Sequence, residues 1–220
     1  MSDVIPTVFV ALARSPIAPA APVAVTDGWE VSARRSTAAL TITDCTPLTK
    51  IQVRAPIDGP AAAALGVRFG RAARDASGTL VVGSGPGEWL LLAGPSADPD
   101  PPPADPSASW VDLTHGRALI RLNGKSAPTV LAQVCGVDLS DTVTPNGAAF
   151  RTSVAALATD VIRDDRDAPS YLLHCERSSG QYLFDALLRA GADLGIEIDG
   201  FRMPDALPTR PENQQSPHGT

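Results

Sequence analysis

One stretch of the chain has the glycine content of a phosphate-binding loop. Residues 83–94 read GSGPGEWLLLAG and follow a short apolar run. A dinucleotide-binding loop needs three glycines spaced GxGxxG and then a helix whose free N–H groups meet the pyrophosphate. The third glycine position holds Glu88, whose carboxylate would repel phosphate, and EWLLLAGP is short and strand-like. We therefore expect a hairpin turn, in which Gly85 or Gly87 supplies a positive φ, and no nucleotide.

A second candidate for chemistry is the motif DLTHGR, which places His115 between Asp112 and Arg117. An imidazole titrates near neutral pH, so at the start of a strand it could contact a ligand or a neighbouring subunit. The alternative is that Asp112 and Thr114 organise a turn and that His115 completes a local hydrogen bond. The motif leaves both interpretations open.

The cysteines do not form a metal-binding pattern. Cys45, Cys135 and Cys175 are far apart, and none belongs to a CxxC pair. His174 precedes Cys175, but adjacent strand residues point to opposite faces, so the two cannot bind one metal ion together. We expect three reduced, buried thiols. No nucleophile paired with a base stands out either, so the sequence assigns no catalytic residue and no metal ligand.

Composition narrows the class of protein. The chain has 220 residues, is 44% hydrophobic and carries a formal net charge of −6, so it can bury a core but lacks the clustered basic residues that nucleic acid requires. No window reaches the roughly 18 apolar residues of a membrane span, and no basic segment opens a secretory signal. We expect a cytoplasmic protein that binds neither nucleic acid nor membrane.

The first half of the chain reads as an arm followed by short strands. Residues 1–28 are rich in Pro and Ala without a period, which predicts an extended N-terminal docking arm. Residues 29–95 form a first α+β half: WEVSARR, ALTITDC and KIQVRAP predict three consecutive antiparallel strands, and a helix begins at Pro60 and ends at the following glycines. Residues 96–109 are dense in Pro, Asp and Ser and predict a linker.

The second half, residues 110–200, reads β-α-β-β-α. Its helices are predicted over 125–135, ended by Gly136, and over SSGQYLFDALLRAGADLG, capped by Ser178 or Ser179. RTSVAALATDVIRDD and SYLLHCE predict two strands, and residues 201–220 a disordered tail. The fold class is therefore α+β, with two small sandwich-like halves of antiparallel sheets covered by helices.

Four short motifs are each weakly specific, but their order along the chain indicates a family resemblance. They are RSP (Arg14, Ser15, Pro16), GEWLLL at 87–92, DLTHGRALIRLNG at 112–124 with a following Ala-Pro helix, and CGVDL at 135–139. In this order the chain resembles the gamma subunit of heterotetrameric sarcosine oxidase from about residue 14 to 200. That family is itself similar to the folate-binding T-protein of the glycine cleavage system, so the resemblance implies a T-protein-like fold.

The resemblance implies a subunit of a flavoenzyme in sarcosine catabolism. Such an oxidoreductase oxidatively demethylates sarcosine, passing the methyl carbon to tetrahydrofolate and electrons to oxygen. The alpha and beta subunits would hold FAD, FMN and NAD and the delta subunit zinc, while the gamma subunit is accessory and binds no cofactor alone. Arg14, Ser15 and Pro16 would contact partner subunits.

Two residues are candidates for the folate side of the complex. Asp160, in LATDVIR, matches the aspartate of the T-protein motif DDLI that holds the pterin, although the glycine-rich lead-in of that motif is replaced by SVAALA. His115 is the other candidate. Two alternatives stay open: a free-standing folate-binding module of the aminomethyltransferase type that uses Asp160, or the same assembly acting on another N-methyl amine.

Overall fold

The computed structural model describes residues 11–97, 99 and 105–202. Within these residues the strands form three sheets, to which three α-helices and two 3-10 turns are added. The strands are β1 (Ala13–Arg14), β2 (Val23–Thr26), β3 (Trp29–Ser32), β4 (Leu40–Asp44), β5 (Thr49–Arg54), β6 (Ala72–Arg74), β7 (Leu80–Gly85), β8 (Glu88–Ala93), β9 (Ser109–Asp112), β10 (Arg117–Gly124), β11 (Ala149–Val154), β12 (Leu157–Arg163), β13 (Ser170–Glu176) and β14 (Glu197–Ile198). The helices are α1 (Pro60–Leu65), α2 (Ala127–Ala132) and α3 (Gly180–Ala190), and the 3-10 turns are η1 (Arg177–Ser179) and η2 (Ala192–Leu194).

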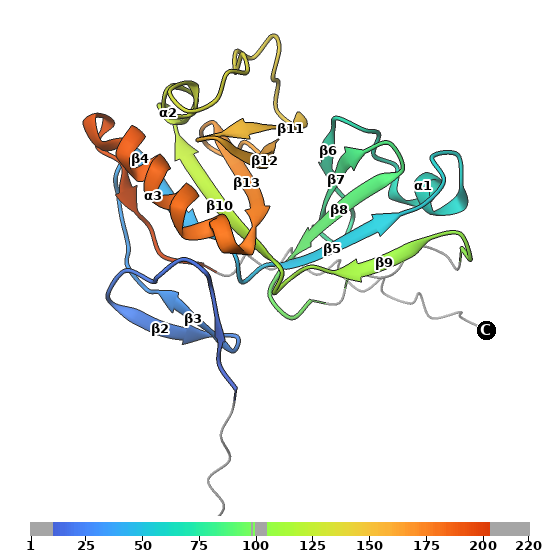
Figure 1. Cartoon of the computed structure of the whole chain (residues 1–220), viewed down its shortest axis with the longest axis horizontal. Helices are drawn as coiled ribbons and strands as arrows, with labels where there is room; N and C mark the ends of the chain where they lie inside the picture. Colours follow the sequence, from blue (N-terminus) through green and yellow to red (C-terminus); the bar gives the residue numbers. More distant parts are fainter. Residues whose placement is uncertain (1–10, 98, 100–104, 203–220) are drawn as a thin grey trace, which may run out of the picture.

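The largest sheet has six strands in the order β11-β12-β13-β10-β4-β14. α3 lies across one face of it, with α2 beside it (Figure 1). Leu183, Phe184 and Leu187 recur at helical spacing in α3 and are buried against Ile120 and Leu173 of the sheet. This face of the sheet holds the largest core of the protein.

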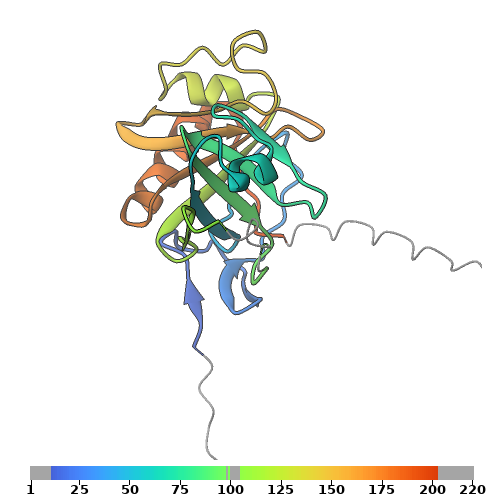
Figure 2. The ribbon, with the colours of Figure 1, turned by 90° about the vertical axis from the view of Figure 1, so that its right-hand side faces the viewer.

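The second sheet has five strands in the order β6-β7-β8-β5-β9 and packs on the other face of the six-stranded sheet. Leu90 and Leu92 of β8 meet Leu119 and Leu172 in the core between the two sheets. α1 covers the outer face of the five-stranded sheet and lies in front of its strands when the molecule is seen from that side (Figure 2). The layers thus run from α2 and α3 through the two sheets to α1, which is the expected α+β architecture.

A third, small sheet has the order β1-β3-β2 and projects away from the two main sheets (Figure 1). β2 and β3 form a hairpin whose turn residues, Asp27 and Gly28, have φ values of 50° and 77°. Trp29 and Val31 of β3 pack with Phe201. The expected arm therefore ends inside a hairpin, and Phe201, the first residue of the expected tail, is buried in this cluster.

The expectation of three consecutive antiparallel strands between residues 29 and 54 is wrong. β3, β4 and β5 belong to three different sheets: β3 pairs with the neighbouring β2 in a hairpin, whereas β4 and β5 pair with strands far along the chain. β4 pairs with β10, and β9 pairs with β5. The expected halves, 29–95 and 110–200, therefore exchange one strand each and do not coincide with the sheets. Much of the expected linker 96–109, as well as residues 1–10 and 203–220, lies outside the described residues.

The glycine-rich stretch forms the hairpin predicted from its sequence. β7 and β8 pair as antiparallel strands with a bulge between Gly83 and Gly85. Gly87 has a φ of 70°, and a Cβ there would lie 2.6 Å from the carbonyl oxygen of Ala55. A side chain at this position would be strained and would also clash, so the glycine serves the turn.

Local predictions differ in how well they hold. α1 ends at Gly66 in the left-handed conformation, as expected. Ser179 is the N-cap residue of α3, as expected, but its side chain makes no capping hydrogen bond, and η1 precedes the helix. The predicted strand RTSVAALATDVIRDD is instead a tight hairpin of β11 and β12. In the described part of the chain, every helix is too short or too polar to cross a lipid bilayer.

Candidate functional site

Three charged or polar side chains form one row across the six-stranded sheet. Arg151 of β11 faces Asp160 of β12, and Asp160 faces His174 of β13. Asp160 Oδ1 accepts a hydrogen bond from Arg151 Nε at 2.7 Å, and Oδ2 accepts one from Arg151 Nη2 at 3.1 Å. His174 Nδ1 lies 3.0 Å from the same Oδ2. We name these three residues the Arg-Asp-His row.

Burial differs along the Arg-Asp-His row. Asp160 and His174 are buried, whereas the Arg151 side chain is 61% exposed. Strand alternation would turn Asp160 toward solvent and Val161 inward, but β12 is covered on both faces at this end, so both residues are buried. The carboxylate is therefore enclosed by the strands beside it and reaches solvent mainly along Arg151.

The protonation states follow from the pairing. Burial is the largest single effect on Asp160 and raises its pKa, but the hydrogen bonds from His174 and Arg151 together outweigh it and bring the pKa to about 2. Burial lowers the pKa of His174, against the opposing effect of Asp160. The row thus holds a carboxylate and a neutral imidazole, whose Nδ1–H donates to Asp160. Nε2 of His174 carries the free lone pair and is buried without a hydrogen-bond partner among the described residues.

An aspartate that orients a histidine is the geometry of a general base. In such a base, Nε2 takes a proton from a nucleophile within hydrogen-bond reach. Here the hydrogen bonds of the row run only among its three members, within the described part of the chain. The row therefore connects three neighbouring strands and satisfies a buried carboxylate. The described residues also contain no group of three metal-ligating side chains.

His115 lies apart from the row and stacks on an aromatic ring. Its ring is 4.9 Å from that of Trp29, at an angle of 9° between the planes. Asp112 and Thr114 organise a turn before His115, as one of the two interpretations of the motif expected. In this turn the N–H of Thr114 donates to Asp112 Oδ1 at 2.7 Å. His115 is exposed, and no described hydrogen bond or ion pair joins it to Asp160. The two expected folate-side residues are thus not brought together.

The motif RSP binds to the core of its own chain. Arg14 pairs with Glu30 at 3.4 Å, and the Arg14 carbonyl oxygen accepts from Arg177 at 2.6 Å. Pro16 packs close to Gly180 at the start of α3, where an added Cβ would lie 2.8 Å from the proline ring. The next residue, Ile17, is 1% exposed and belongs to the main core. The Arg14 side chain is nevertheless 73% exposed, so it can still meet a partner.

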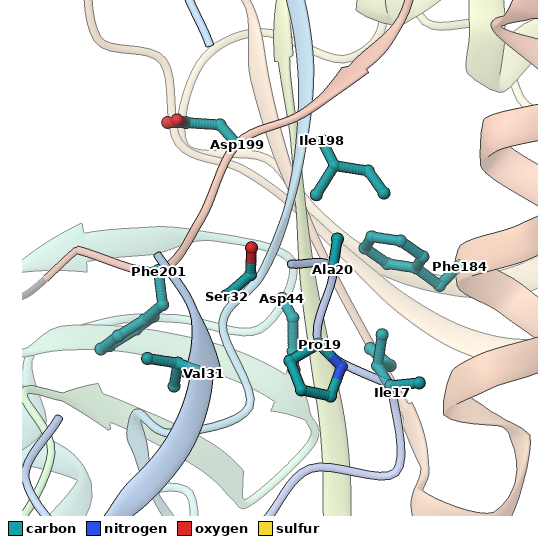
Figure 3. A pocket seen from close by; sticks show the side chains of 11 residues that line it. Ile17, Pro19, Ala20, Val31, Ser32, Asp44, Phe184, Ile198, Asp199 and Phe201 are labelled. Atoms are coloured by element: carbon teal, nitrogen blue, oxygen red, sulfur yellow. The ribbon is translucent and has the colours of Figure 1, made fainter. Parts of the chain in front are cut away.

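Figure 3 shows the space that the arm encloses. Ile17 and Pro19 of the arm face Phe184 of α3 and Ile198 of β14, with Asp44 behind them. The cavity measures about 20 Å³, which is room for about one water molecule. Pockets for cofactors are an order of magnitude larger. The arm therefore seals the core and does not cover a ligand site.

Sequence reasoning missed the most deeply buried charge, Lys50 of β5. The residue is fully buried, and its Nζ donates to the carbonyl oxygens of Thr46 at 2.6 Å and Leu48 at 2.7 Å. Burial lowers its pKa to about 7, although Asp44 and Asp112 act in the opposite direction. Lysine in an alternating strand normally points to solvent, so the pattern TKIQVR gave no signal of this burial.

The comparisons with known proteins agree on the fold. No family model matches the sequence, and the curated proteins include no match. A chain of heterotetrameric sarcosine oxidase from Corynebacterium sp. U-96 superposes on 73% of this chain and 88% of its own length, with 24% identity and a TM-score of 0.60. Glycine cleavage system aminomethyltransferase T from Bartonella henselae superposes on 81% of this chain, with 15% identity and a TM-score of 0.56.

The chain has a T-protein-like fold. The resemblance inferred from the motifs RSP, GEWLLL, DLTHGR and CGVDL is thereby confirmed at the level of structure. The chain covers 55% of the Bartonella protein, so it spans about half of that aminomethyltransferase. It covers 88% of the sarcosine oxidase chain, so the same fold corresponds to most of one relative and to about half of the other.

Proposed function

We propose that this chain is the gamma subunit of a heterotetrameric sarcosine oxidase. The single observation that carries the proposal is the superposition on 88% of a sarcosine oxidase chain, because it relates this protein to most of the length of one chain of that complex. The assembly would oxidatively demethylate sarcosine to glycine, passing the methyl carbon to tetrahydrofolate and electrons to oxygen. The three free thiols support a cytoplasmic location, since reducing compartments preserve thiols.

Within this assembly we assign the chain an accessory role. Its most perturbed titratable groups are engaged in holding the fold: Asp160 by Arg151 and His174, and Lys50 by two carbonyl oxygens. FAD, FMN and NAD would belong to the alpha and beta subunits and zinc to the delta subunit. Arg14 and its neighbours Ser15 and Pro16 would contribute to contacts with these subunits.

The arrangement of side chains around Asp160 does not favour a direct contact between this residue and folate. Both carboxylate oxygens already accept hydrogen bonds, and Arg151 covers the exposed side. A pterin would reach Asp160 only after Arg151 had moved away. His115 is exposed and stacks on Trp29, and no described hydrogen bond joins it to the Arg-Asp-His row. We therefore propose that tetrahydrofolate binds to another subunit.

Co-expression tests the subunit assignment. A tagged copy of the chain is produced alone and together with large flavin-carrying subunits of sarcosine oxidase type from the same genome. We expect all chains to co-purify in fixed stoichiometry, the complex to oxidise sarcosine, and the isolated chain to be inactive. Purification of an active flavoenzyme without this chain would contradict the proposal.

The match to aminomethyltransferase T supports a second candidate, a free-standing folate-binding module. In that case the isolated chain would bind tetrahydrofolate, and Asp160→Ala would abolish the heat of binding in calorimetry. A third candidate keeps the complex and changes the amine. It is tested by comparing turnover of sarcosine with turnover of other N-methyl amines by the purified complex.

A further inference from the structure

The five-stranded sheet covers the inner face of the six-stranded sheet over only part of its width. Leu119 and Leu172 lie on the covered part, in the core between the sheets. Further along the same face, Arg121 faces Thr43 and Asn123 faces Thr41 across β10 and β4. These side chains are polar and half-buried, and they line a groove of about 410 Å³. We name it the polar groove.

The polar groove is walled by two segments that are remote in the sequence. The loop between β12 and β13 supplies Arg166 and Asp167, and the segment after β14 supplies Asp199 and Arg202. Figure 3 shows the Asp199 carboxylate pointing away from the apolar cavity beneath the arm. Grooves of this size accept small organic molecules. The shape therefore fits a ligand of the size of a metabolite.

One side chain in the floor of the polar groove, Arg121, is held in place by hydrogen bonds. Arg121 donates from Nη2 to Asp164 Oδ2 at 2.8 Å and from Nη1 to Ser170 Oγ at 2.6 Å. By contrast, Thr41, Thr43 and Asn123 make no side-chain hydrogen bond to another described residue. Their hydroxyl and amide groups are therefore available to a ligand, next to a guanidinium that is fixed in place.

Charges of both signs face the polar groove. Arg166 is exposed and has no carboxylate within ion-pair distance among the described residues. Arg121, Arg166 and Arg202 carry positive charge, and Asp164, Asp167 and Asp199 carry negative charge at or directly behind the lining. These six charges balance, which disfavours phosphates because they need an excess of positive charge. Arg121 pairs with Asp164 and Arg202 with Asp199, so among the described residues the lining charges without an ion-pair partner are Arg166 and Asp167. One free charge of each sign favours a ligand that also carries both.

We propose that the polar groove binds a small zwitterion of the amino-acid class. The carboxylate of the ligand pairs with Arg166, its ammonium group faces Asp167, and the hydroxyl and amide groups of β4 and β10 complete its hydrogen bonds. This binding is a property of the isolated chain. It does not depend on the subunit assignment above, so either proposal can fail without the other.

Titration calorimetry on the full chain tests the proposal with glycine and sarcosine as probes. Acetate and methylammonium, each with one charge, serve as controls at equal ionic strength. We expect the zwitterions to bind about tenfold more tightly than either control. Arg166→Ala should weaken zwitterion binding by about tenfold and Asn123→Ala by a few-fold, whereas Arg189→Ala on the exposed side of α3 should change nothing.

Three results would overturn the proposal. The first is no heat of binding for glycine and sarcosine at millimolar concentrations. The second is acetate binding as tightly as glycine, which would indicate a simple anion site. The third is unchanged affinity in Arg166→Ala, which would place binding outside the groove. Because Arg166 is exposed, circular dichroism should show that this variant folds normally, and co-purification with flavin-carrying subunits is a separate readout.

Discussion

Asp160 and Lys50 are both buried charges, yet the protein treats them in opposite ways. Asp160 lies between two side chains that stabilise its negative charge, and its pKa falls to about 2. Lys50 is held by two neutral carbonyl oxygens, and its pKa falls to about 7 because burial outweighs the nearby carboxylates. The comparison shows that direct pairing, and not burial, decides whether a buried group keeps its charge near neutral pH.

The largest expected effect on stability comes from removing the buried carboxylate of Asp160. Asp160→Ala leaves Nδ1 of the buried His174 without an acceptor, while the exposed Arg151 turns to solvent. Removing one partner of a buried pair costs about 3 to 5 kcal/mol, and the exposure of Arg151 favours the lower end. We expect the free energy of unfolding at pH 7 to fall by about 3 kcal/mol in urea denaturation.

A matched control for this variant is Asp193→Ala. Asp193 is exposed in η2, so we expect a change within about 0.5 kcal/mol. Asp160→Asn keeps one oxygen as an acceptor for His174 and should lose less than Asp160→Ala. If Asp160→Ala were as mild as the control, the Arg-Asp-His row would not hold the sheet together.

The second effect concerns Lys50 and is a pH dependence of the free energy of unfolding. The folded-state pKa of Lys50, about 7, lies below the usual 10.5, so the unfolded chain binds more protons between these values. Stability therefore rises with pH in this window and is lowest below pH 7. From pH 7 to pH 8.5 we expect the free energy of unfolding to increase by about 1.5 kcal/mol.

The variant Lys50→Met should remove this rise, because methionine fills similar space without titrating. The measurement must stop near pH 8.5. Burial raises the pKa of the Cys45 and Cys175 thiols to about 11, so above pH 9 the unfolded chain loses protons that the folded chain keeps, and stability falls. An identical pH profile for the variant and the native chain would show that Lys50 does not titrate in this range.

A third change acts on the hairpin that carries Arg151 and Asp160. Its turn residues, Ala155 and Ala156, have φ values of 48° and 65°, which alanine adopts with strain. Ala156 is exposed, so Ala156→Gly relieves strain without touching the core. We expect a gain of about 1 kcal/mol and a loss of similar size for Ala156→Val. The pH dependence assigned to Lys50 should stay unchanged in both variants, which would separate the two regions.

This turn also illustrates where sequence reasoning stops. The β7–β8 hairpin could be predicted, because its glycines permit a positive φ at the turn, which Gly87 adopts. Ala155 and Ala156 do not predict a turn, because alanine does not favour a positive φ. The φ values at this turn are imposed by strand pairing on either side. Periodicity likewise located the helices, whereas the assignment of β4 and β5 to two different sheets depends on partners far along the chain.

The site shows the same limit. The family motif directed attention to Asp160, but its partners Arg151 and His174 lie nine and fourteen residues away and become neighbours only through strand register. Lys50 could not be found at all, because its burial results from β5 packing between β8 and β9. Residue type suggests chemistry, but cross-strand neighbours determine the protonation state.

The smallest effect on stability concerns Arg14 of the N-terminal arm, which pairs with Glu30 of β3. Its ion pair with Glu30 is 3.4 Å long and its side chain is 73% exposed, so Arg14→Ala should change the free energy of unfolding by less than about 0.5 kcal/mol. If the arm contacts a partner subunit as proposed, the same variant weakens co-purification with the flavin-carrying subunits at elevated salt. The neighbouring change Ile17→Ala opens the main core and should lower stability by about 3 kcal/mol. A variant at Arg14 that destabilised the isolated chain as much as Ile17→Ala would show that the arginine serves the fold and not an interface.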